Sequence, residues 1–129
     1  MGYIDNIEKK TLDNSNFRTV LFTGGHMQLV VMSLKPMEDI GMEVHENVDQ
    51  FFRFEKGEGK VIMNGEESIV GAEMVAIVPA GTQHNVINTS QTEDLKLYTI
   101  YAPANHPEGT VHVTKEEAMA AEEGKHHNE

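Results

Sequence analysis

A carboxylate and an imidazole stand two residues apart at Glu43 and His45. Side chains two positions apart on a β-strand project from the same face, and Gln50 can join them from the next strand if a turn intervenes. A carboxylate, an imidazole and an amide oxygen suit a borderline divalent metal ion. The pattern also has a plainer interpretation, because a Glu-x-His pair on a strand edge is usually a solvated surface.

A second histidine in a suitable position lies downstream. His84 follows the turn Pro79-Ala-Gly81, among the first residues of a strand predicted over 83–88. The starts of strands line the mouth of a β-barrel, so an inward-facing His84 can converge with the first group. We therefore expect a mixed nitrogen and oxygen site with positions left open for water or substrate, held by Glu43, His45, Gln50 and His84.

Short β-strands are predicted for most of the chain, because runs rich in Val, Leu, Phe and Thr alternate with glycine, proline and Asn-Gly turns. Strands at this spacing, with no long helical period, are typical of an all-β sandwich or barrel. The predicted strands cover 17–23, 27–34, 51–55, 60–63, 68–70, 73–78, 83–88 and 95–101. Hairpins are expected at Gly24-Gly25 and Asn64-Gly65, and Gly57-Glu-Gly59 is expected to fold the chain back as a third.

The organisation is that of one domain with short additions at both ends. Residues 1–15 are polar and predict an N-terminal arm that packs on the domain or on a second subunit. The barrel domain covers 16–113, and 114–129 is a C-terminal helix with an acidic tail. Thr114 can cap that helix over 115–123, with Glu117 three residues on, and Gly124 can end it.

Composition narrows the possible functions. With 129 residues, 39% of them hydrophobic, the chain fits a single domain with a modest core. Cysteine is absent, so a metal must be held by nitrogen and oxygen ligands. The net charge of −11, with ten unclustered basic residues, argues against nucleic acid as a partner. The N-terminus has no cationic apolar signal and no bilayer-length apolar run, so we expect a soluble, cytoplasmic protein without a membrane partner.

Over about residues 30–102 the chain resembles the cupin superfamily, whose members are small jelly-roll β-barrels with two motifs. The second motif is matched by Pro79-x-Gly81, two residues, His84, three residues and Asn88. The first motif, a Gly, H-x-H, Glu, Gly pattern, is matched with substitutions. Six residues separate Gln50 from Gly57, so Gln50 takes the acidic position. His45 then takes the place of the second histidine and Glu43 that of the first.

A rival alignment puts His45 first and Asn47 second, but leaves only two residues before Gln50. We prefer the former. The family's common ligand set is three histidines and a glutamate, and this chain offers two imidazoles, a carboxylate and a neutral amide. Fewer imidazoles lower the affinity for late first-row divalent ions, so zinc, nickel, iron and manganese all remain candidates.

The resemblance implies a metal-dependent enzyme acting on a small polar molecule, with isomerase, lyase or dioxygenase chemistry; sugar-phosphate isomerase-like proteins are nearest in pattern. The competing hypothesis is a non-catalytic module that binds or senses a small molecule. Without a metal, Glu43 or His45 could serve as a general base. Family members of this kind exchange or pair N-terminal strands, which implies a homodimer.

Other residues surround the expected site. Phe52 and Phe54 alternate with Gln50 and are expected to point into the barrel beside Val86, as walls of a small-molecule pocket. His106 and His112 belong either to a lid over the barrel or to a crossing that leads to the C-terminal helix. Core filling is expected of Met27, Met32, Met63 and Met74. An anionic substrate could meet Arg18, Arg53 or Lys60, although strand residues of this type are mostly solvated.

Overall fold

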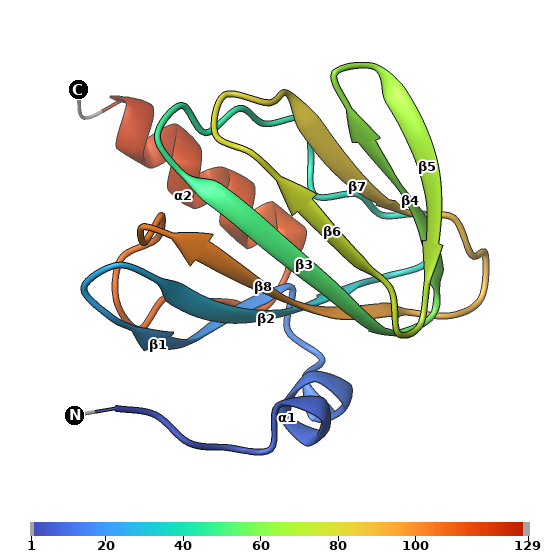
Figure 1. Ribbon diagram of the computed structural model, residues 1–129, viewed down its shortest axis with the longest axis horizontal. Coiled ribbons are helices and arrows are strands. Elements are labelled where there is room, and N and C mark those ends of the chain that lie inside the picture. Colours follow the sequence, from blue (N-terminus) through green and yellow to red (C-terminus); the bar gives the residue numbers. More distant parts are fainter. Residues whose placement is uncertain (1, 128–129) are drawn as a thin grey trace.

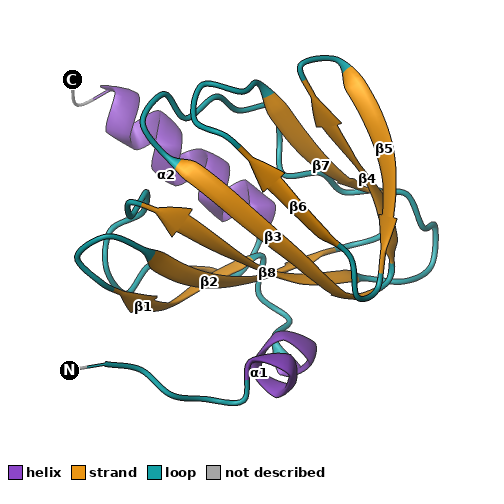
Figure 2. Cartoon of the chain, viewed as in Figure 1, coloured by secondary structure: helices purple, strands orange, loops and turns teal. Residues whose placement is uncertain are grey.

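The computed structural model describes residues 2–127, with side chains as far as Glu122, and its strands form two antiparallel sheets (Figures 1 and 2). One sheet has the order β6-β3-β8-β2-β1-β9, and the other the order β5-β4-β7. The strands are β1 Arg18–Thr23, β2 Gln28–Leu34, β3 Asp49–Lys56, β4 Glu58–Met63, β5 Glu66–Gly71, β6 Val75–Val78, β7 His84–Asn88, β8 Leu95–Ala102 and β9 Val111–His112. The predicted all-β jelly-roll barrel with a short C-terminal helix is confirmed, and β9 is the described strand that the sequence patterns missed.

Alternation along each strand builds the core. On β3, Gln50, Phe52 and Phe54 are buried, whereas the residues between them are half-buried. The inward orientation expected for both phenylalanines and for Val86 is therefore confirmed. Of the four methionines predicted as core filler, Met32 is fully buried and Met63 packs against the core. The prediction was wrong for the other two methionines. Met27 and Met74 lie between strands, and 49% and 46% of their surfaces are exposed.

The Gly57-Glu-Gly59 segment is not a hairpin, contrary to expectation. It carries the chain from one sheet to the other, because β3 pairs with β6 and β8 whereas β4 pairs with β5 and β7. Gly57 has a φ of +100°, and a Cβ there would lie 2.6 Å from the Asp94 carbonyl oxygen. A Cβ on Gly59 would lie 2.4 Å from the Ile87 carbonyl oxygen. The two glycines therefore allow backbones to pass closely at this corner.

The other two turns form as predicted. Asn64 and Gly65 take φ values of 48° and 84° and join β4 to β5, with Met63 paired to Glu66. These positive values match a two-residue hairpin turn. Gly24 donates to the Met27 carbonyl at 2.8 Å in the β1–β2 hairpin.

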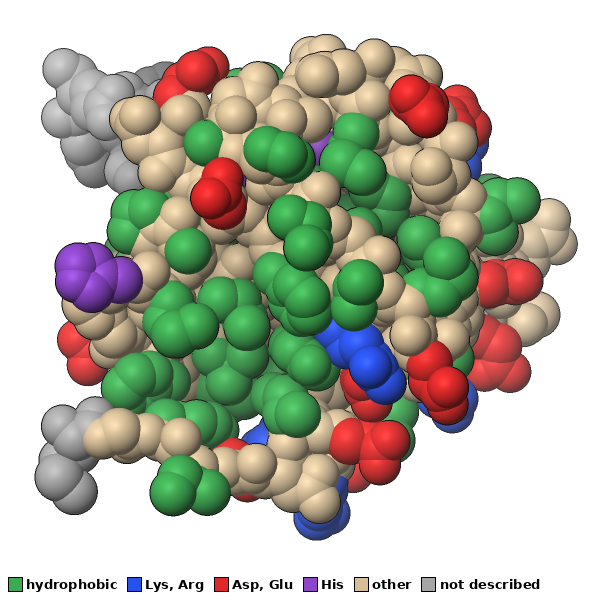
Figure 3. Space-filling model, in the orientation of Figure 1, with side chains coloured by type: hydrophobic (Ala, Val, Ile, Leu, Met, Phe, Trp, Pro, Cys, Tyr) green, Lys and Arg blue, Asp and Glu red, His purple; other side chains and the backbone are tan. Residues whose placement is uncertain are grey.

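The outer face of the six-stranded sheet carries a continuous apolar row, hereafter the outer row. Cross-strand pairing places Ile77, Phe51, Ile100, Leu29 and Phe22 side by side on five strands. Ile77 is 61% exposed. Hydrophobic side chains gather across the middle of this face, over β6, β3, β8 and β2 (Figure 3). The other four side chains of the outer row are half-buried.

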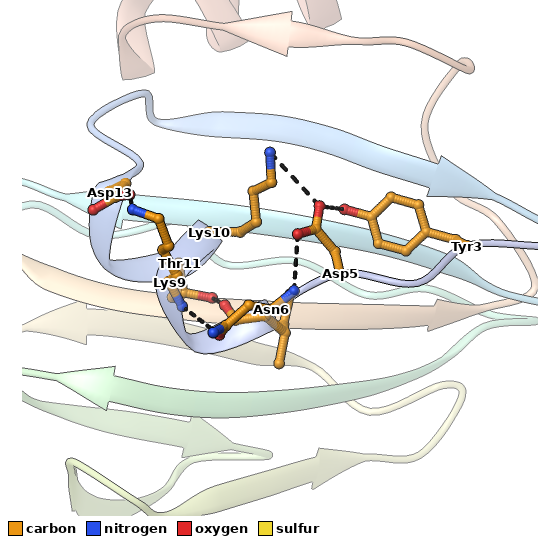
Figure 4. Close-up of polar contacts among 8 residues, drawn as sticks. Tyr3, Asp5, Asn6, Lys9, Lys10, Thr11 and Asp13 are labelled. Atoms are coloured by element: carbon orange, nitrogen blue, oxygen red, sulfur yellow. Dashed lines mark hydrogen bonds and ion pairs between the residues drawn. The ribbon is translucent and has the colours of Figure 1, made fainter.

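The N-terminal segment contains a helix that the polar composition did not predict. Helix α1, Ile7–Asp13, is capped by Asn6, whose Oδ1 accepts from the Lys9 amide at 3.0 Å. Tyr3 donates its hydroxyl to Asp5 at 2.9 Å, and Lys9 pairs with Asp13 at 2.7 Å (Figure 4). The helix packs against β2, β3 and β8, so the segment lies on its own sheet.

The C-terminal helix α2 covers Lys115–His127. Its start is confirmed, because the Glu117 amide donates to Thr114 Oγ1 at 3.1 Å. Its end at Gly124 was wrong: Gly124 keeps a helical backbone, and a glycine ends a helix where it adopts the left-handed conformation. Residues 128–129 of the predicted tail lie outside the described residues. Neither helix among the described residues is long and apolar enough to cross a membrane.

Candidate metal centre

Backbone pairing brings Glu43 and His84 together from distant parts of the chain. The two residues form an isolated antiparallel bridge, with hydrogen bonds of 2.8 Å from the Glu43 amide and 2.9 Å from the His84 amide. The Gly81 amide donates to the His45 carbonyl at 2.8 Å. Directly opposed residues on such a pair present their side chains on the same face. The segment before β3 is thereby aligned with the start of β7.

The same segment is held further by Asn85. Its side-chain oxygen accepts from the Gly41 amide at 2.9 Å, and its Nδ2 donates to Asp39 at 2.8 Å. Asp39 also pairs with Lys115 at the start of α2. Asn88 of the second motif donates instead to the backbone carbonyls of Leu34, Lys35 and Glu93, so it clamps loops and does not reach the site.

Glu43, His45 and His84 each offer one ligand atom, and these three atoms lie within 4.8 Å of one another. The Glu43 Oε2 to His45 Nε2 distance is 3.8 Å, and the two imidazole centroids are 5.5 Å apart. Metal–ligand bonds of about 2.0–2.2 Å place neighbouring ligand atoms roughly 3–4 Å apart. Small side-chain adjustments would therefore bring the three atoms around one ion. These are three of the four residues that the sequence predicts.

Three buried side-chain atoms of the predicted ligands have no hydrogen-bond partner: His45 Nε2, His84 Nε2 and Gln50 Oε1. His84 Nδ1 lies 2.9 Å from the Thr82 carbonyl oxygen, which can only accept, so Nδ1 carries the proton and Nε2 presents a lone pair. Gln50 donates its Nε2 to Thr99 Oγ1 at 3.0 Å, which leaves Oε1 without a partner. Buried acceptors in this state are unusual, and their chemistry fits a cation.

Gln50 is buried on β3, in the sheet that does not contain His84. It stands opposite Tyr101 in the β3–β8 register, and the Tyr101 ring centroid is 6.0 Å from that of His45. The Gln50 amide and the His45 ring therefore border the same buried phenol. As a fourth ligand, Gln50 stays a prediction.

Burial determines the protonation of these groups. Burial raises the pKa of Glu43 to about 7; the Arg18 charge lowers the pKa and the Glu122 charge raises it by smaller amounts. Burial also lowers the pKa of His45, with a further lowering from His84. His45 is therefore mostly neutral at pH 7, which is the form that binds metals. A bound cation would displace the remaining proton from Glu43.

Tyr101 borders the site, although the sequence patterns did not single it out. Tyr101 is 2% exposed. It follows Leu95, Leu97 and Thr99 as the last inward-facing residue of β8, and this alternation is the sequence signal that could have identified it. Burial raises the pKa of Tyr101 to about 12, so its hydroxyl stays protonated. The His106 Nε2 lies 3.2 Å from this hydroxyl, and its segment forms a crossing that pairs with β1 at His112 and leads to α2.

The chain belongs to the cupin domain family, whose model matches residues 30–101. It is 51% identical over 127 residues to the uncharacterized protein YrkC of Bacillus subtilis, a match that covers 94% of this chain and 68% of YrkC. The crystal structure of BH2720 from Bacillus halodurans is 46% identical, with a TM-score of 0.91 over 93% of this chain and 95% of that one. A predicted oxalate decarboxylase from Thermotoga maritima is 26% identical, with a TM-score of 0.56 over 60% of this chain and 66% of that one.

Proposed function

We propose that this chain is a metal-binding enzyme of the cupin family, with a divalent ion held by Glu43, His45, Gln50 and His84. One observation carries the proposal: His45 and His84 lie beside the Glu43 carboxylate, and the Nε2 atoms of both histidines and the Oε1 of Gln50 are buried without hydrogen-bond partners. An unsatisfied buried acceptor costs about 1–3 kcal/mol, and one cation would satisfy all of them. The nitrogen and oxygen donor set suits zinc, nickel, iron or manganese.

The chain's own groups suit reactions of a small polar substrate. Phe52, whose ring centroid is 6.3 Å from that of His84, and the fully buried Val86 form an apolar wall that excludes water. The Tyr101 hydroxyl is a protonated donor, and Glu43 would accept a proton only in the absence of a metal. A bound ion would supply Lewis acidity or an oxygen-binding centre.

Isomerase, lyase and dioxygenase reactions all fit this arrangement, including the sugar-phosphate isomerase type. Within that range, the likeness to the Thermotoga maritima protein, a predicted oxalate decarboxylase, supports a lyase acting on a carboxylic acid. The substrate we propose is thus a small polar metabolite, with no nucleic acid partner.

Metal analysis tests the site directly. Protein purified without an affinity tag is analysed by inductively coupled plasma mass spectrometry, alongside His84→Ala and His26→Ala variants. We expect close to one ion per chain in the wild type and in His26→Ala, because His26 is exposed in the β1–β2 turn. His84→Ala should lose the ion. A folded His84→Ala protein that keeps its full metal content would contradict the proposal.

A second experiment separates an enzyme from a binding or sensing module built on the same site. The metal-loaded protein is incubated with a panel of sugar phosphates and small carboxylic acids and followed by proton NMR. Turnover that His84→Ala abolishes supports the enzyme. Saturable binding without turnover of any bound compound would favour the binding module.

We also infer a homodimer formed through the outer row. The row spans five strands, and the charge beside it is neutralised within the chain, since Arg53 Nε lies 2.7 Å from Glu55 Oε1. A second copy of the same face would therefore meet apolar side chains without leaving an unpaired charge.

A further inference from the structure

Arg18 is a buried cation at the start of β1. It is 3% exposed, and its side chain lies on the inward face with Val20. Its Nη1 lies 3.1 Å from His112 Nδ1, and its Nε is buried without a hydrogen-bond partner. Among the described residues, no carboxylate lies within ion-pair distance of Arg18. The expectation that strand arginines are solvated is therefore wrong for this one.

Burying a guanidinium without an ion-pair partner lowers the stability of the fold. The guanidinium cannot shed its proton, and burying an ion without a counter-charge costs several kcal/mol. Its identified neighbours are neutral acceptors and rings: the His112 nitrogen, the Tyr101 hydroxyl and the Phe17 ring, 5.2 Å away. The Nε–H group is the buried Arg18 donor without a partner, and two adjacent N–H groups of a guanidinium match an anionic oxygen pair.

Arg18 belongs to the same interior as the candidate metal centre. Its charge lowers the pKa of Glu43, His45 and Tyr101, and the Tyr101 ring lies beside that of His45, with centroids 6.0 Å apart. If Glu43 coordinates a cation, its negative charge is compensated there and does not neutralise Arg18. With Glu43 engaged in this way, no carboxylate among the described residues lies at ion-pair distance from Arg18.

We propose that Arg18 binds the anionic group of the ligand, and that this ligand is a small carboxylic acid with a second oxygen donor, such as a hydroxy acid or a keto acid. The inference rests on the proposed function for its second point of attachment, since the second oxygen would reach the metal. A single guanidinium matches a monoanionic carboxylate.

Calorimetric titration with glycolate tests the proposal on wild-type, Arg18→Met and Arg53→Met proteins, each loaded with the same metal. Arg53 is the matched control, because it lies on the outer face paired with Glu55. We expect Arg18→Met to keep its metal content and to bind glycolate roughly tenfold to a hundredfold more weakly, the loss expected for a charge-assisted pair. Arg53→Met should bind as the wild type does.

Unchanged glycolate affinity in folded Arg18→Met would overturn the assignment. If inorganic phosphate binds more tightly than glycolate in an Arg18-dependent way, the carboxylate class is wrong. Arg18→Lys provides a second variant if Arg18→Met does not fold; it keeps the charge without the fork, and affinity equal to the wild type would contradict bidentate binding.

If the metal proposal is wrong, metal uptake and melting temperature give a different combination of results. In that case the wild-type protein takes up no ion, whereas glycolate should still raise the melting temperature of the metal-free wild type and not that of Arg18→Met. No glycolate-dependent rise in the metal-free wild type, together with no binding to the metal-treated protein, would overturn the anion site itself.

Discussion

Glu43 and His84 exchange two backbone hydrogen bonds across a single antiparallel bridge, which aligns their side chains as neighbours on one face. The bridge joins the segment before β3 to the first residue of β7. A metal bound by both side chains would clip together two parts of the chain that are 41 residues apart in sequence. Metal binding should therefore be coupled to the stability of the fold.

Removing the metal should lower the melting temperature. A ligand present at a thousandfold excess over its dissociation constant stabilises a protein by about 4 kcal/mol. Differential scanning calorimetry before and after chelation measures the change. His45→Ala should abolish the metal-dependent part and His26→Ala should retain it. Equal melting temperatures with and without metal would show that the ion does not bridge these segments.

Replacing Gln50 by glutamate should strengthen metal binding. Gln50→Glu exchanges a neutral amide oxygen for a charged one at the position where the first cupin motif has its acid. We expect an affinity gain of at least about tenfold, from a second carboxylate at the ion. Competition with a chelating dye measures it, with Gln50→Ala expected to weaken binding. Unchanged affinity in both variants would remove Gln50 from the ligand set.

The stability of the metal-free protein should depend on the protonation of Glu43. Burial raises the pKa of Glu43 from 4.5 to about 7, so between these pH values the folded protein holds a proton that the unfolded chain releases. The contribution of Glu43 to the free energy of unfolding should fall as pH rises through this window, by roughly 3 kcal/mol in total.

Comparison with Glu43→Gln isolates that contribution, because His45 acts in the opposite direction. Burial lowers the pKa of His45, so its contribution is lost as pH falls below the usual value of 6.5. Urea denaturation of both proteins at pH 5, 6, 7 and 8 gives the difference in stability. A wild-type advantage that does not shrink toward pH 8 would contradict the raised pKa.

The corner between the sheets should not tolerate a side chain at Gly59. A Cβ there would lie 2.4 Å from the Ile87 carbonyl oxygen, on a backbone that cannot move without disturbing the β4–β7 pairing. Gly59→Ala should lower the free energy of unfolding by about 1–3 kcal/mol. Gly25→Ala is the control, since nothing lies within 4 Å of a Cβ at that position. Similar urea midpoints for both variants would contradict the close approach.

A charge in the outer row should prevent dimerisation. Ile77→Asp would bury a carboxylate at the β6 end of the inferred interface, and we expect a monomer by light scattering coupled to size-exclusion chromatography. Ile69→Asp should leave the dimer intact, because Ile69 is 84% exposed on β5 of the other sheet. A monomeric wild type, or a dimeric Ile77→Asp, would refute an interface on this face.

Local pattern determined much of the fold. The eight longer strands follow from alternating apolar residues and from turns such as Asn64-Gly65, whose positive φ values the residue types themselves favour. Helix α1 was missed because Ile7–Asp13 is mostly polar, even though Asn6 is a good capping residue. The pairing of strands across sheets is not local, which is why Gly57 was wrongly expected to close a hairpin.

The sequence by itself determined which residues could bind a metal, because His84 and the Glu43-x-His45 pair stand in recognisable spacings beside turns. Tertiary structure alone decided that Glu43 and His84 share a bridge, that Tyr101 borders them, and that Arg18 is buried beside His112, 94 residues away in sequence. The physical reason is that side-chain periodicity is set within a few residues, whereas burial and charge compensation depend on which distant strands pair.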